Sequence, residues 1–539
     1  MDELSRIRNL VIPCFALFMV LGNQVACERI LIIAQAPFYS HVSVIRELSL
    51  ALNKRGHEIV MVTPHPTKNL PANYTEIDFS SSLKMPELLS VLSRLFGYQA
   101  ATRLESYLVI YDYLQIYTKY FYEHPDIKRI YAEDSKERFD LVIAEHVLTH
   151  GICFIAHKLK APLITILSVE INLVHHHILG NHLLPSHPSN WEFHDSTGLE
   201  VPFWVRVKNF VHALLLVRQW YYYETGSIYD IVKEYLGSNI PSPFDVLKNI
   251  SLILVNYDPV LTYARPMPFN FVGYSNWTVV DNPPPLPKDI LEFLGTASEG
   301  FIYMNLGSTI NSTMLPAKTL TAISNVFSRL PYKIIWKFET NLPKKSENIF
   351  IRDWIPQQSV LAHKNIKLFI YQGGLQSTEE TIHYGVPIIG IPLIFDQLYR
   401  IKKLMSLGVG RMLDFTELDE ETFQEAVIDV LNNKRYKTKM LELRHLAKDK
   451  PYNSKDRAIW WVEYVLRHKG APHLRFSGAD DPWYQRYDMD IVAFLSIMFF
   501  IVTVICIITL LRTLQWCFRY YKSYESKHPS SDQKRSKIE

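Results

Sequence analysis

The sequence predicts an α/β protein with two parallel-sheet halves and one C-terminal transmembrane helix. Two observations predict the sheets: a strand–helix–strand opening over residues 30–64, and a second series of alternating strands and helices from residue 300. A strand, a helix and a second strand in this order form a parallel pair with a right-handed crossover. The third observation is an uncharged, almost wholly apolar run at Ile491–Leu511, whose 21 residues are long enough to span a bilayer.

The composition is that of a large and mostly folded chain. Of its 539 residues, 48% are hydrophobic and 21% are charged, and the formal net charge is +3. Such a near-neutral balance gives no support for nucleic-acid binding. Five cysteines in this length do not form a disulfide framework, so the apolar core must stabilise the fold.

The first half, residues 28–271, opens with a buried strand and an amphipathic helix. The strand is ILIIAQAPF (30–38), the helix runs to about Arg55 and stops at Gly56, and HEIVMVTP (57–64) is the next strand. Further apolar runs predict strands at 139–145, 161–168 and 251–258.

Residues 272–288 lose this periodicity and contain four prolines, which predicts an interdomain linker. The second half, residues 289–470, repeats the pattern of the first. Strands are expected at 300–308, 332–339 and 349–354, a helix near 316–328, and helical segments from about Asp419 to Lys469.

The two ends of the chain predict a secreted body with a membrane anchor. Residues 1–27 resemble a cleaved signal peptide, with a retained N-terminal anchor as the alternative. After the luminal stretch 471–490 and the span 491–511, the tail 512–539 is basic, so the positive-inside rule places it in the cytosol and the body in the lumen. This single-pass type I topology is consistent with four glycosylation sequons, at Asn73, Asn249, Asn276 and Asn311.

The stretch Trp354–Gln397 contains the strongest functional pattern. An apolar run, the Gly373–Gly374 turn and a helix follow one another, and the N–H groups at the start of such a helix favour an anion such as phosphate. Glu380 lies on that helix, where its carboxylate could reach sugar hydroxyls. Asp396 and Gln397 end the next apolar run, at the strand edge where open α/β sheets bind ligands.

At these residues the chain resembles the UDP-glucuronosyl/UDP-glucosyltransferase family, in its membrane-anchored animal form. The matching residues are Trp354, Pro356, Gln357, His363, Gly373, Gly374, Ser377, Glu380, Gly385, Val386, Pro387, Asp396 and Gln397. The resemblance implies the GT-B fold, in which two Rossmann-like domains face a cleft. It also implies a UDP-sugar as co-substrate, no cofactor and no metal. The tail sequence Arg535-Ser-Lys537 is weakly similar to a basic retrieval signal for the endoplasmic reticulum, with Arg where Lys is usual, so we expect the protein in that membrane.

The resemblance assigns donor binding to the second half. Trp354 would stack on uracil, with Gln357 holding the base, while Ser308 and Ser377 would donate hydrogen bonds to the diphosphate. Glu380 would accept from the ribose, and Asp396 and Gln397 would read the transferred sugar. Each residue taken singly could instead be an ordinary core or surface residue.

The resemblance assigns the catalytic base to His41, which follows the first strand. A histidine suits proton removal from an acceptor hydroxyl near neutral pH, although His41 could also merely cap its helix. The family's aspartate partner corresponds by counting to His150. An imidazole there could hydrogen-bond His41, but it would bring no negative charge to stabilise the protonated base.

Three further positions depart from the family pattern. Gln372 and Gln376 stand where the family has histidine and asparagine, and both amides can still donate hydrogen bonds. Arg400 replaces an asparagine and could lie near the diphosphate or the sugar. There it could compensate for Gln372, favour a donor with a carboxylate, or clash with a neutral sugar.

The leading prediction is an inverting transferase that moves a hexosyl or glucuronosyl group to a hydroxyl of a small lipophilic acceptor. The alternatives are a catalytically impaired relative that binds nucleotide sugar or lipophile, and a receptor with an unrelated ectodomain. Tyrosine-rich stretches at 107–122 and 220–223 could line the acceptor pocket, lie against the membrane, or be core. The histidines between 175 and 187 lack accompanying carboxylates at ligand spacing, so no metal site is expected. The oligomeric state stays open, a homo-oligomer included.

Overall fold

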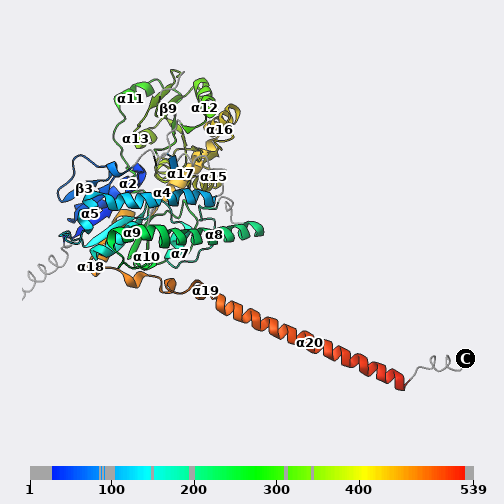
Figure 1. The fold of residues 1–539 in the computed structure, drawn as a ribbon. Helices are drawn as coiled ribbons and strands as arrows, with labels where there is room; N and C mark the ends of the chain where they lie inside the picture. The colour runs from blue at the N-terminus through cyan, green and yellow to red at the C-terminus, as the bar shows by residue number, and fades with distance from the viewer. Residues whose placement is uncertain are drawn as a thin grey trace, which may run out of the picture. The chain divides into compact units, whose positions relative to one another are not determined.

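The computed structural model describes residues 27–83, 87, 90–91, 103–146, 151–193, 201–308, 314–340 and 345–528. The chain divides into two compact units, Met1–Phe476 and Ser477–Glu539. The first unit contains two parallel sheets, one for each predicted half (Figure 1).

The first sheet has seven strands in the order β3-β2-β1-β4-β5-β6-β7, and every neighbouring pair is parallel. Its strands are short runs rich in Ile, Leu and Val that are buried on both faces, as expected for a covered parallel sheet. Their bounds are β1 (Arg29–Ile33), β2 (Glu58–Thr63), β3 (Tyr74–Asp78), β4 (Leu141–Glu145), β5 (Leu163–Leu167), β6 (Leu252–Asn256) and β7 (Phe271–Tyr274).

Helices cover both faces of this sheet. One face packs against a large aromatic-rich core that includes Tyr117, Phe121 and Trp220. The helices of this half are α2 (Tyr39–Lys54), α4 (Arg103–Glu123), α5 (Pro125–Tyr131), α6 (Phe154–Leu159), α7 (Leu173–Ile178), α8 (Phe203–Tyr223), α9 (Tyr229–Leu236) and α10 (Pro243–Lys248).

The second sheet has six parallel strands in the order β10-β9-β8-β11-β12-β13. The strands are β8 (Phe301–Asn305), β9 (Lys333–Lys337), β10 (Ile349–Arg352), β11 (Ile366–Tyr371), β12 (Ile388–Gly390) and β13 (Gly410–Met412). The helices are α11 (Lys288–Leu294), α12 (Ala317–Arg329), α13 (Gln357–Leu361), α14 (Leu375–Tyr384), α15 (Gln397–Ser406), α16 (Glu420–Asn432) and α17 (Lys434–Lys448).

The strand order reverses once in each sheet, and these reversals position the site. In the first sheet β1 lies between β2 and β4, and Ile33 at the end of β1 pairs with Ala144 of β4. In the second, β8 lies between β9 and β11, and Asn305 pairs with Tyr371. The loops that leave the carboxyl ends of two such strands diverge, and open α/β sheets bind ligands in the crevice between them.

Helix α18 (Ser454–His468) follows the second half in sequence but packs on the first sheet. Its residues Ala458, Val462 and Val465 are buried in the same core as Ile30 and Leu48. Arg55 also forms an ion pair with the buried Glu463, at 2.8 Å between Nε and Oε1. Through these contacts, α18 connects the end of the second half to the first half.

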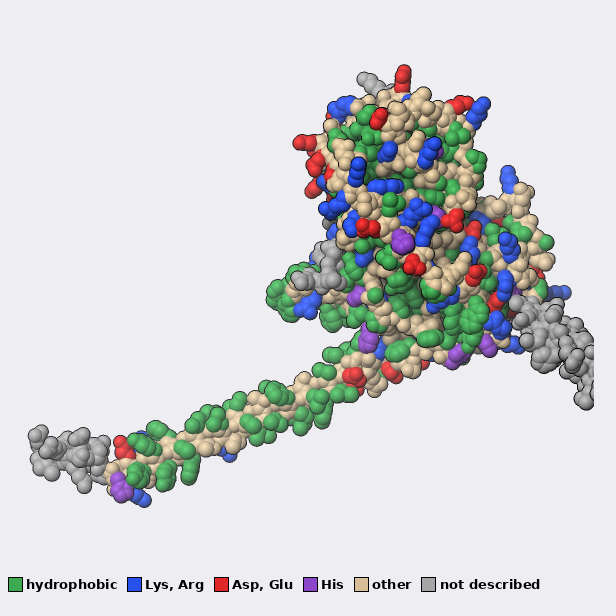
Figure 2. Space-filling view, turned by 180° about the vertical axis from the view of Figure 1, so that it is seen from behind, with side chains coloured by type: hydrophobic (Ala, Val, Ile, Leu, Met, Phe, Trp, Pro, Cys, Tyr) green, Lys and Arg blue, Asp and Glu red, His purple; other side chains and the backbone are tan. Residues whose placement is uncertain are grey.

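The second unit contains the short helix α19 (Trp483–Arg486) and the long helix α20 (Met489–Lys527). By length and composition, α20 is the one helix among the described residues that could cross a membrane. It includes the predicted span 491–511 and ends at Lys527, within the basic segment that follows the span. Figure 2 shows hydrophobic side chains along most of its length.

The predicted fold class is confirmed: two parallel Rossmann-like sheets and one long apolar C-terminal helix. Two boundaries differ in detail from the expected division at 272–288 and 470. Residues 272–274 of the expected linker pair with β6 as part of β7, and α18 belongs to the core of the first half. Neither is visible in a local pattern, because each depends on a contact with a distant part of the chain.

Candidate functional site

A cleft of about 1060 Å³ lies between the two sheets of the first unit, and residues from both halves line it. Segments that follow β1 and β5 supply one wall, and segments that follow β8 and β11 supply the other. The lining includes every predicted donor residue except Gly373 and Arg400, and it also includes His41. The structure therefore brings the predicted base and most of the predicted donor site into one cavity.

His41 lies in the first turn of α2, directly after the loop that leaves β1. Its Nδ1 is 2.7 Å from Oε1 of Glu145, the last residue of β4, whose side chain is completely buried. Because β1 and β4 are neighbours at the strand reversal, the two side chains meet at the carboxyl edge of the sheet.

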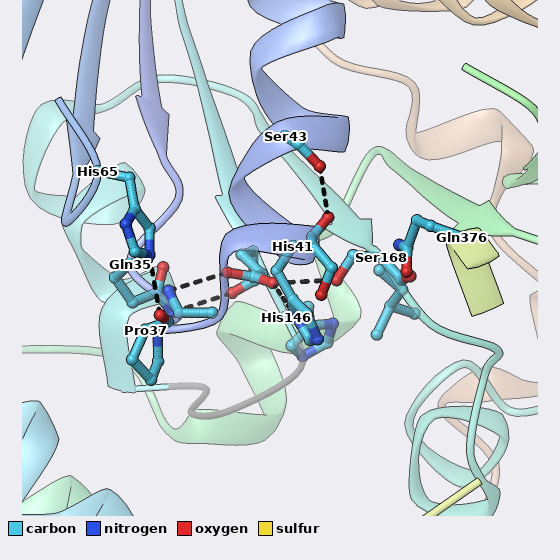
Figure 3. Close-up of polar contacts among 12 residues, drawn as sticks. Gln35, Pro37, His41, Ser43, His65, His146, Ser168 and Gln376 are labelled. Carbon is cyan, nitrogen blue, oxygen red and sulfur yellow. Dashed lines mark hydrogen bonds and ion pairs between the residues drawn. The ribbon is translucent and has the colours of Figure 1, made fainter. Parts of the chain in front are cut away.

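Three further hydrogen bonds fix Glu145 (Figure 3). Ser168 Oγ donates to Oε1 at 3.1 Å, and the Ala36 backbone N–H donates to Oε2 at 3.1 Å. The side chain of Gln35 donates to the Glu145 carbonyl at 3.4 Å. A carboxylate only accepts hydrogen bonds, so the contact places the proton of neutral His41 on Nδ1. The Nε2 lone pair is then available to accept a proton from a substrate.

His150, the predicted partner of His41, lies outside the described residues, as does the sequon Asn311. The family pattern predicts the partner of His41 after the strand FDLVIAE, whereas the residue that contacts His41 is Glu145, the final residue of that strand. The strand order contains the signal that would have found it: the last residue of β4 lies beside the end of β1.

Gln357 lies at the centre of the cleft wall that holds the predicted donor residues. Its Oε1 accepts from Asn305 Nδ2 at 2.7 Å, and its Nε2 donates to Ser377 Oγ at 2.9 Å and to Glu380 Oε2 at 2.6 Å. Burial raises the pKa of Glu380 to about 7, although the hydrogen bond from Gln357 acts in the opposite direction. A ligand with hydroxyl groups that binds here would therefore contact side chains that are already joined to one another by hydrogen bonds.

The glycine turns hold the backbone close to this set. Gly307 and Gly373 have φ of 92° and 94°, a region that favours glycine. A Cβ on Gly307 would lie 2.2 Å from Nε2 of Gln372. The side-chain amide oxygen of Gln372, Oε1, is buried and has no hydrogen-bond partner among the described residues, so a ligand donor would satisfy it.

Lys337, which sequence reasoning did not single out, also lines the cleft at the end of β9. Its Nζ donates to the carbonyl of Gly307 at 3.0 Å and pairs with Glu339. Since Ser308 follows Gly307, a buried cation lies next to the loop expected to hold the diphosphate.

Trp354 and Gln376 approach the first half. The Trp354 ring is 56% exposed, and its centroid is 5.5 Å from that of Tyr39 at an edge-on angle of 86°. Gln376 Nε2 donates to the carbonyl of Ser168 at 3.2 Å (Figure 3). Ser168 therefore contacts both Glu145 and the donor-side helix α14.

Asp396 is the N-cap residue of α15 and Gln397 is its first residue, and both line the cleft. The side-chain oxygen of Gln397 accepts the N–H groups of Leu393 and Ile394 at 2.8 and 3.0 Å, which leaves its NH₂ group for other partners.

Arg400 does not line the cleft and is only 1% exposed. Its guanidinium pairs with Asp396, donates to the carbonyl of Gly373 at 2.7 Å and lies 3.9 Å from Glu170. Burial raises the pKa of Glu170 to about 7, against the opposing effect of Arg400. Arg400 therefore lies outside the cleft lining and holds Asp396 and the Gly373 backbone, which are close to the cleft, through these contacts.

Three histidines of the histidine-rich segment form hydrogen-bond contacts with neighbouring protein groups. His175 contacts Asn172 Oδ1 at 2.6 Å through Nδ1 and the carbonyl of His146 at 2.9 Å through Nε2. His176 Nδ1 lies 3.0 Å from Asn181 Nδ2, and His187 Nδ1 lies 2.7 Å from Ser189 Oγ.

Comparison with known proteins supports the assignment that this geometry suggests. Residues 28–527 match the family described as "UDP-glucoronosyl and UDP-glucosyl transferase". The chain is 32% identical over 471 residues to UDP-glycosyltransferase UGT5 of Dactylopius coccus, covering 87% of this chain and 88% of that protein. It is 28% identical over 541 residues to UDP-glucuronosyltransferase 1A6 of Mus musculus, covering 96% and 98%.

The fold is also found among solved structures. A UDP-glucosyltransferase from Polygonum tinctorium aligns with a TM-score of 0.53 and 14% identity, covering 82% of this chain and 98% of that chain. At this identity the likeness concerns the GT-B fold alone. The family match extends over nearly the whole chain and therefore shows more than the fold. This protein is an enzyme of the UDP-glucuronosyl and UDP-glucosyl transferase family.

Proposed function

We propose that the protein transfers a hexosyl or glucuronosyl group from a UDP-sugar to a hydroxyl of a small lipophilic acceptor, with inversion. The observation that carries the proposal is the His41–Glu145 contact at the edge of a cleft whose opposite wall holds Gln357, Ser377 and Glu380. Base and donor wall face the same space, as a direct transfer between two bound substrates requires.

In this proposal Nε2 of His41 removes the proton from the acceptor hydroxyl. The acceptor oxygen forms a bond to the anomeric carbon while the bond from that carbon to the diphosphate oxygen breaks, and UDP leaves with the electron pair. Attack from the face opposite the leaving group inverts the anomeric centre. Glu145 orients the imidazole and stabilises its protonated form.

The donor would lie along the second wall. Trp354 would stack on uracil beside Gln357, and Glu380 would accept from the ribose. Ser308, Ser377 and the N-terminus of α14 would bind the diphosphate, with Lys337, Gln372, Gly373, Gly374 and Gln376 around it. Asp396, held by Arg400, and Gln397 would contact the sugar.

The lipophilic acceptor is supported by the lining of the first wall. Phe38, Ile110, Leu114, Trp191 and Trp220 line the cleft on the side of His41. Apolar and aromatic side chains with a few placed polar groups are typical of sites for small lipophilic molecules.

We further propose that α20 anchors the protein in the endoplasmic reticulum membrane, with the body in the lumen and residues 512–539 in the cytosol. The apolar length of α20 and the basic residues after position 511 support this topology. Asn73 and Asn249 are exposed and Asn276 is half-buried, so all three are candidates for glycosylation.

A single assay tests the transferase. The full-length protein in native membranes is given UDP-glucose or UDP-glucuronic acid with a panel of phenols and sterols, and released UDP and product stereochemistry are measured. We expect UDP release that depends on an acceptor, and a product with inverted configuration. UDP-sugar binding without transfer would favour the alternative, a catalytically impaired binding protein. No binding of any UDP-sugar would overturn the donor-site assignment.

A further inference from the structure

Helix α8 packs on the body through a narrow stripe. Its buried residues are Asn209, Ala213, Leu216 and Trp220, spaced four, three and four positions apart, so they lie on one side of the helix. At the inner end of this stripe, Trp220 lines the cleft. The rest of the helix circumference faces away from the core.

The outward circumference of α8 is unusually apolar. Trp204 is 76% exposed and Phe210 is 55% exposed, and they belong to a set of exposed apolar side chains that we call the α8 apolar face: Phe203, Trp204, Val207, Phe210, Val211, Leu214 and Leu215. A surface helix of a soluble body normally carries polar residues on its outer side, as α16 does with Glu420, Glu421 and Glu425. A contiguous patch of this kind marks an interaction surface.

The charges on α8 indicate the kind of partner. No Asp or Glu occurs in Phe203–Tyr223, whereas Arg206, Lys208 and Arg218 are exposed. The Arg206 guanidinium lies 5.7 Å from the centre of the Phe203 ring. Figure 2 shows this end of the body as a projecting lobe of hydrophobic side chains beside basic ones. Aromatic and aliphatic residues flanked only by cations are typical of helices that lie in a membrane interface, where lipid phosphates pair with the cations.

The chain itself keeps this helix near a bilayer. Only Ser477–Asp488 separates the first unit from α20, and these twelve residues span at most about 40 Å when extended. If α20 crosses a membrane, as proposed above, the body cannot move further than this from the lipid surface. Tethering of this kind raises the effective concentration of a weakly binding surface by orders of magnitude.

We propose that the α8 apolar face docks into the boundary between lipid headgroups and acyl chains of the membrane that holds α20. The inference rests on the proposed membrane anchor. The side of α8 opposite the bilayer then carries Trp220, part of the acceptor wall. A lipophilic acceptor dissolved in the membrane would accordingly have a short path to the cleft along one helix.

The test separates the contact made by α8 from the anchor. The full chain with a protease site inserted within Ser477–Asp488 is reconstituted into vesicles of phosphatidylcholine and phosphatidylserine, then cleaved to completion and sedimented. We compare wild type with Trp204→Glu/Phe210→Glu/Leu214→Glu, and with a matched control at exposed apolar residues of other helices, Leu291→Glu/Ile428→Glu/Leu446→Glu. Because all six positions are exposed, unchanged UDP binding by each variant verifies that it is folded.

We expect the cleaved body of wild type and control to remain on the vesicles, and the α8 variant to be released with at least a tenfold lower bound-to-free ratio. Release of the wild-type body, or retention of the α8 variant, would overturn the proposal. Sedimentation of the uncut chain reports on α20 separately. If the uncut chain stays in solution, the anchor assignment fails, while binding of the cleaved body to added vesicles still decides the role of α8.

A second measurement distinguishes lipid from a second copy of the chain. A photoreactive phenylalanine analogue replaces Phe210 or, as the control, Leu446 in the uncut chain in the same vesicles. Lipid adducts at position 210 and none at 446 are expected. Protein–protein adducts at position 210 would assign the α8 apolar face to a dimer contact and overturn the proposal.

Discussion

Nδ1 of His41 lies 2.7 Å from the buried carboxylate of Glu145. Glu145 is in turn fixed by Ser168, whose carbonyl contacts Gln376 on the opposite side of the cleft. The proposed base, its orienting carboxylate and the donor-side helix α14 thus form one connected series of hydrogen bonds across the two halves.

Ser168→Ala tests whether this connection matters for catalysis. The substitution removes one hydrogen bond to the Glu145 carboxylate, and such bonds contribute roughly 1.5–3 kcal/mol. If the imidazole is oriented only by the remaining contacts, kcat falls about tenfold while KM for the UDP-sugar stays within about twofold. Initial rates over a range of donor concentrations give both constants. A change confined to KM would place Ser168 in substrate binding instead.

Gln357→Leu tests the donor wall. The variant removes an amide that joins Asn305, Ser377 and Glu380, and with it the hydrogen bond from Gln357 to the raised-pKa carboxyl of Glu380. We expect UDP to bind about tenfold to a hundredfold more weakly by titration calorimetry, since each of these polar groups loses a hydrogen bond. Gln424→Leu is the control in the same half, because Gln424 is exposed on α16 and does not line the cleft. Equal losses in both variants would contradict the assigned role of Gln357.

Arg400 provides a stability test. Arg400→Met leaves Asp396 and Glu170 without the cation that faces them in a buried setting. Removal of one partner of a buried ion pair typically costs about 3–5 kcal/mol. Chemical denaturation should therefore show a large loss, and Arg400→Met/Asp396→Asn should recover part of it. If the single variant is as stable as wild type, the guanidinium does not support the Asp396 turn.

The buried Glu379 predicts a pH dependence of stability. Burial raises its pKa from 4.5 to about 7, although the Asn276 N–H bonded to it and nearby Lys450 act in the opposite direction. Between these pH values the folded chain keeps a proton that the unfolded chain releases, so the free energy of unfolding falls as the pH rises through this window. Glu170 and Glu380 contribute with the same sign.

Glu379→Gln isolates the contribution of this residue to the pH dependence of the free energy of unfolding. The amide keeps an acceptor for the Asn276 N–H but does not titrate. We expect the variant to match wild type below about pH 4.5 and to exceed it by on the order of 3 kcal/mol above about pH 7, from denaturation at each pH. A constant difference between the two proteins across the range would contradict the assignment.

Asn73 is the glycosylation site that the structure favours. It is exposed at a turn with φ of 56°, before the edge strand β3. Asn249, by contrast, donates through its side-chain amide to the carbonyl of Asp245 at 2.7 Å. In protein made by a secretory cell line, Asn73→Gln should lose one glycan on a mobility gel. Unchanged mobility would mean that Asn73 is not occupied.

The sequence was sufficient for features that depend on local pattern. Apolar runs located β1, β4, β5, β6 and β8, and the helix spacing located α2. The pattern from Trp354 to Gln397 singled out residues most of which line one cleft. The contacts of Glu145 could not be read in this way, because they join elements more than 100 residues apart. For the same reason the sequence left the role of Arg400 open and did not show that α18 packs on the first sheet.

The most direct test of the central claim compares UDP release by wild type, His41→Ala, Glu145→Gln and His150→Ala under identical donor and acceptor conditions. The account predicts acceptor-dependent release by wild type, and a loss of about a hundredfold or more in kcat for His41→Ala and Glu145→Gln. His150→Ala should retain most of the rate. Full activity in Glu145→Gln, or a loss confined to His150→Ala, would contradict the His41–Glu145 mechanism.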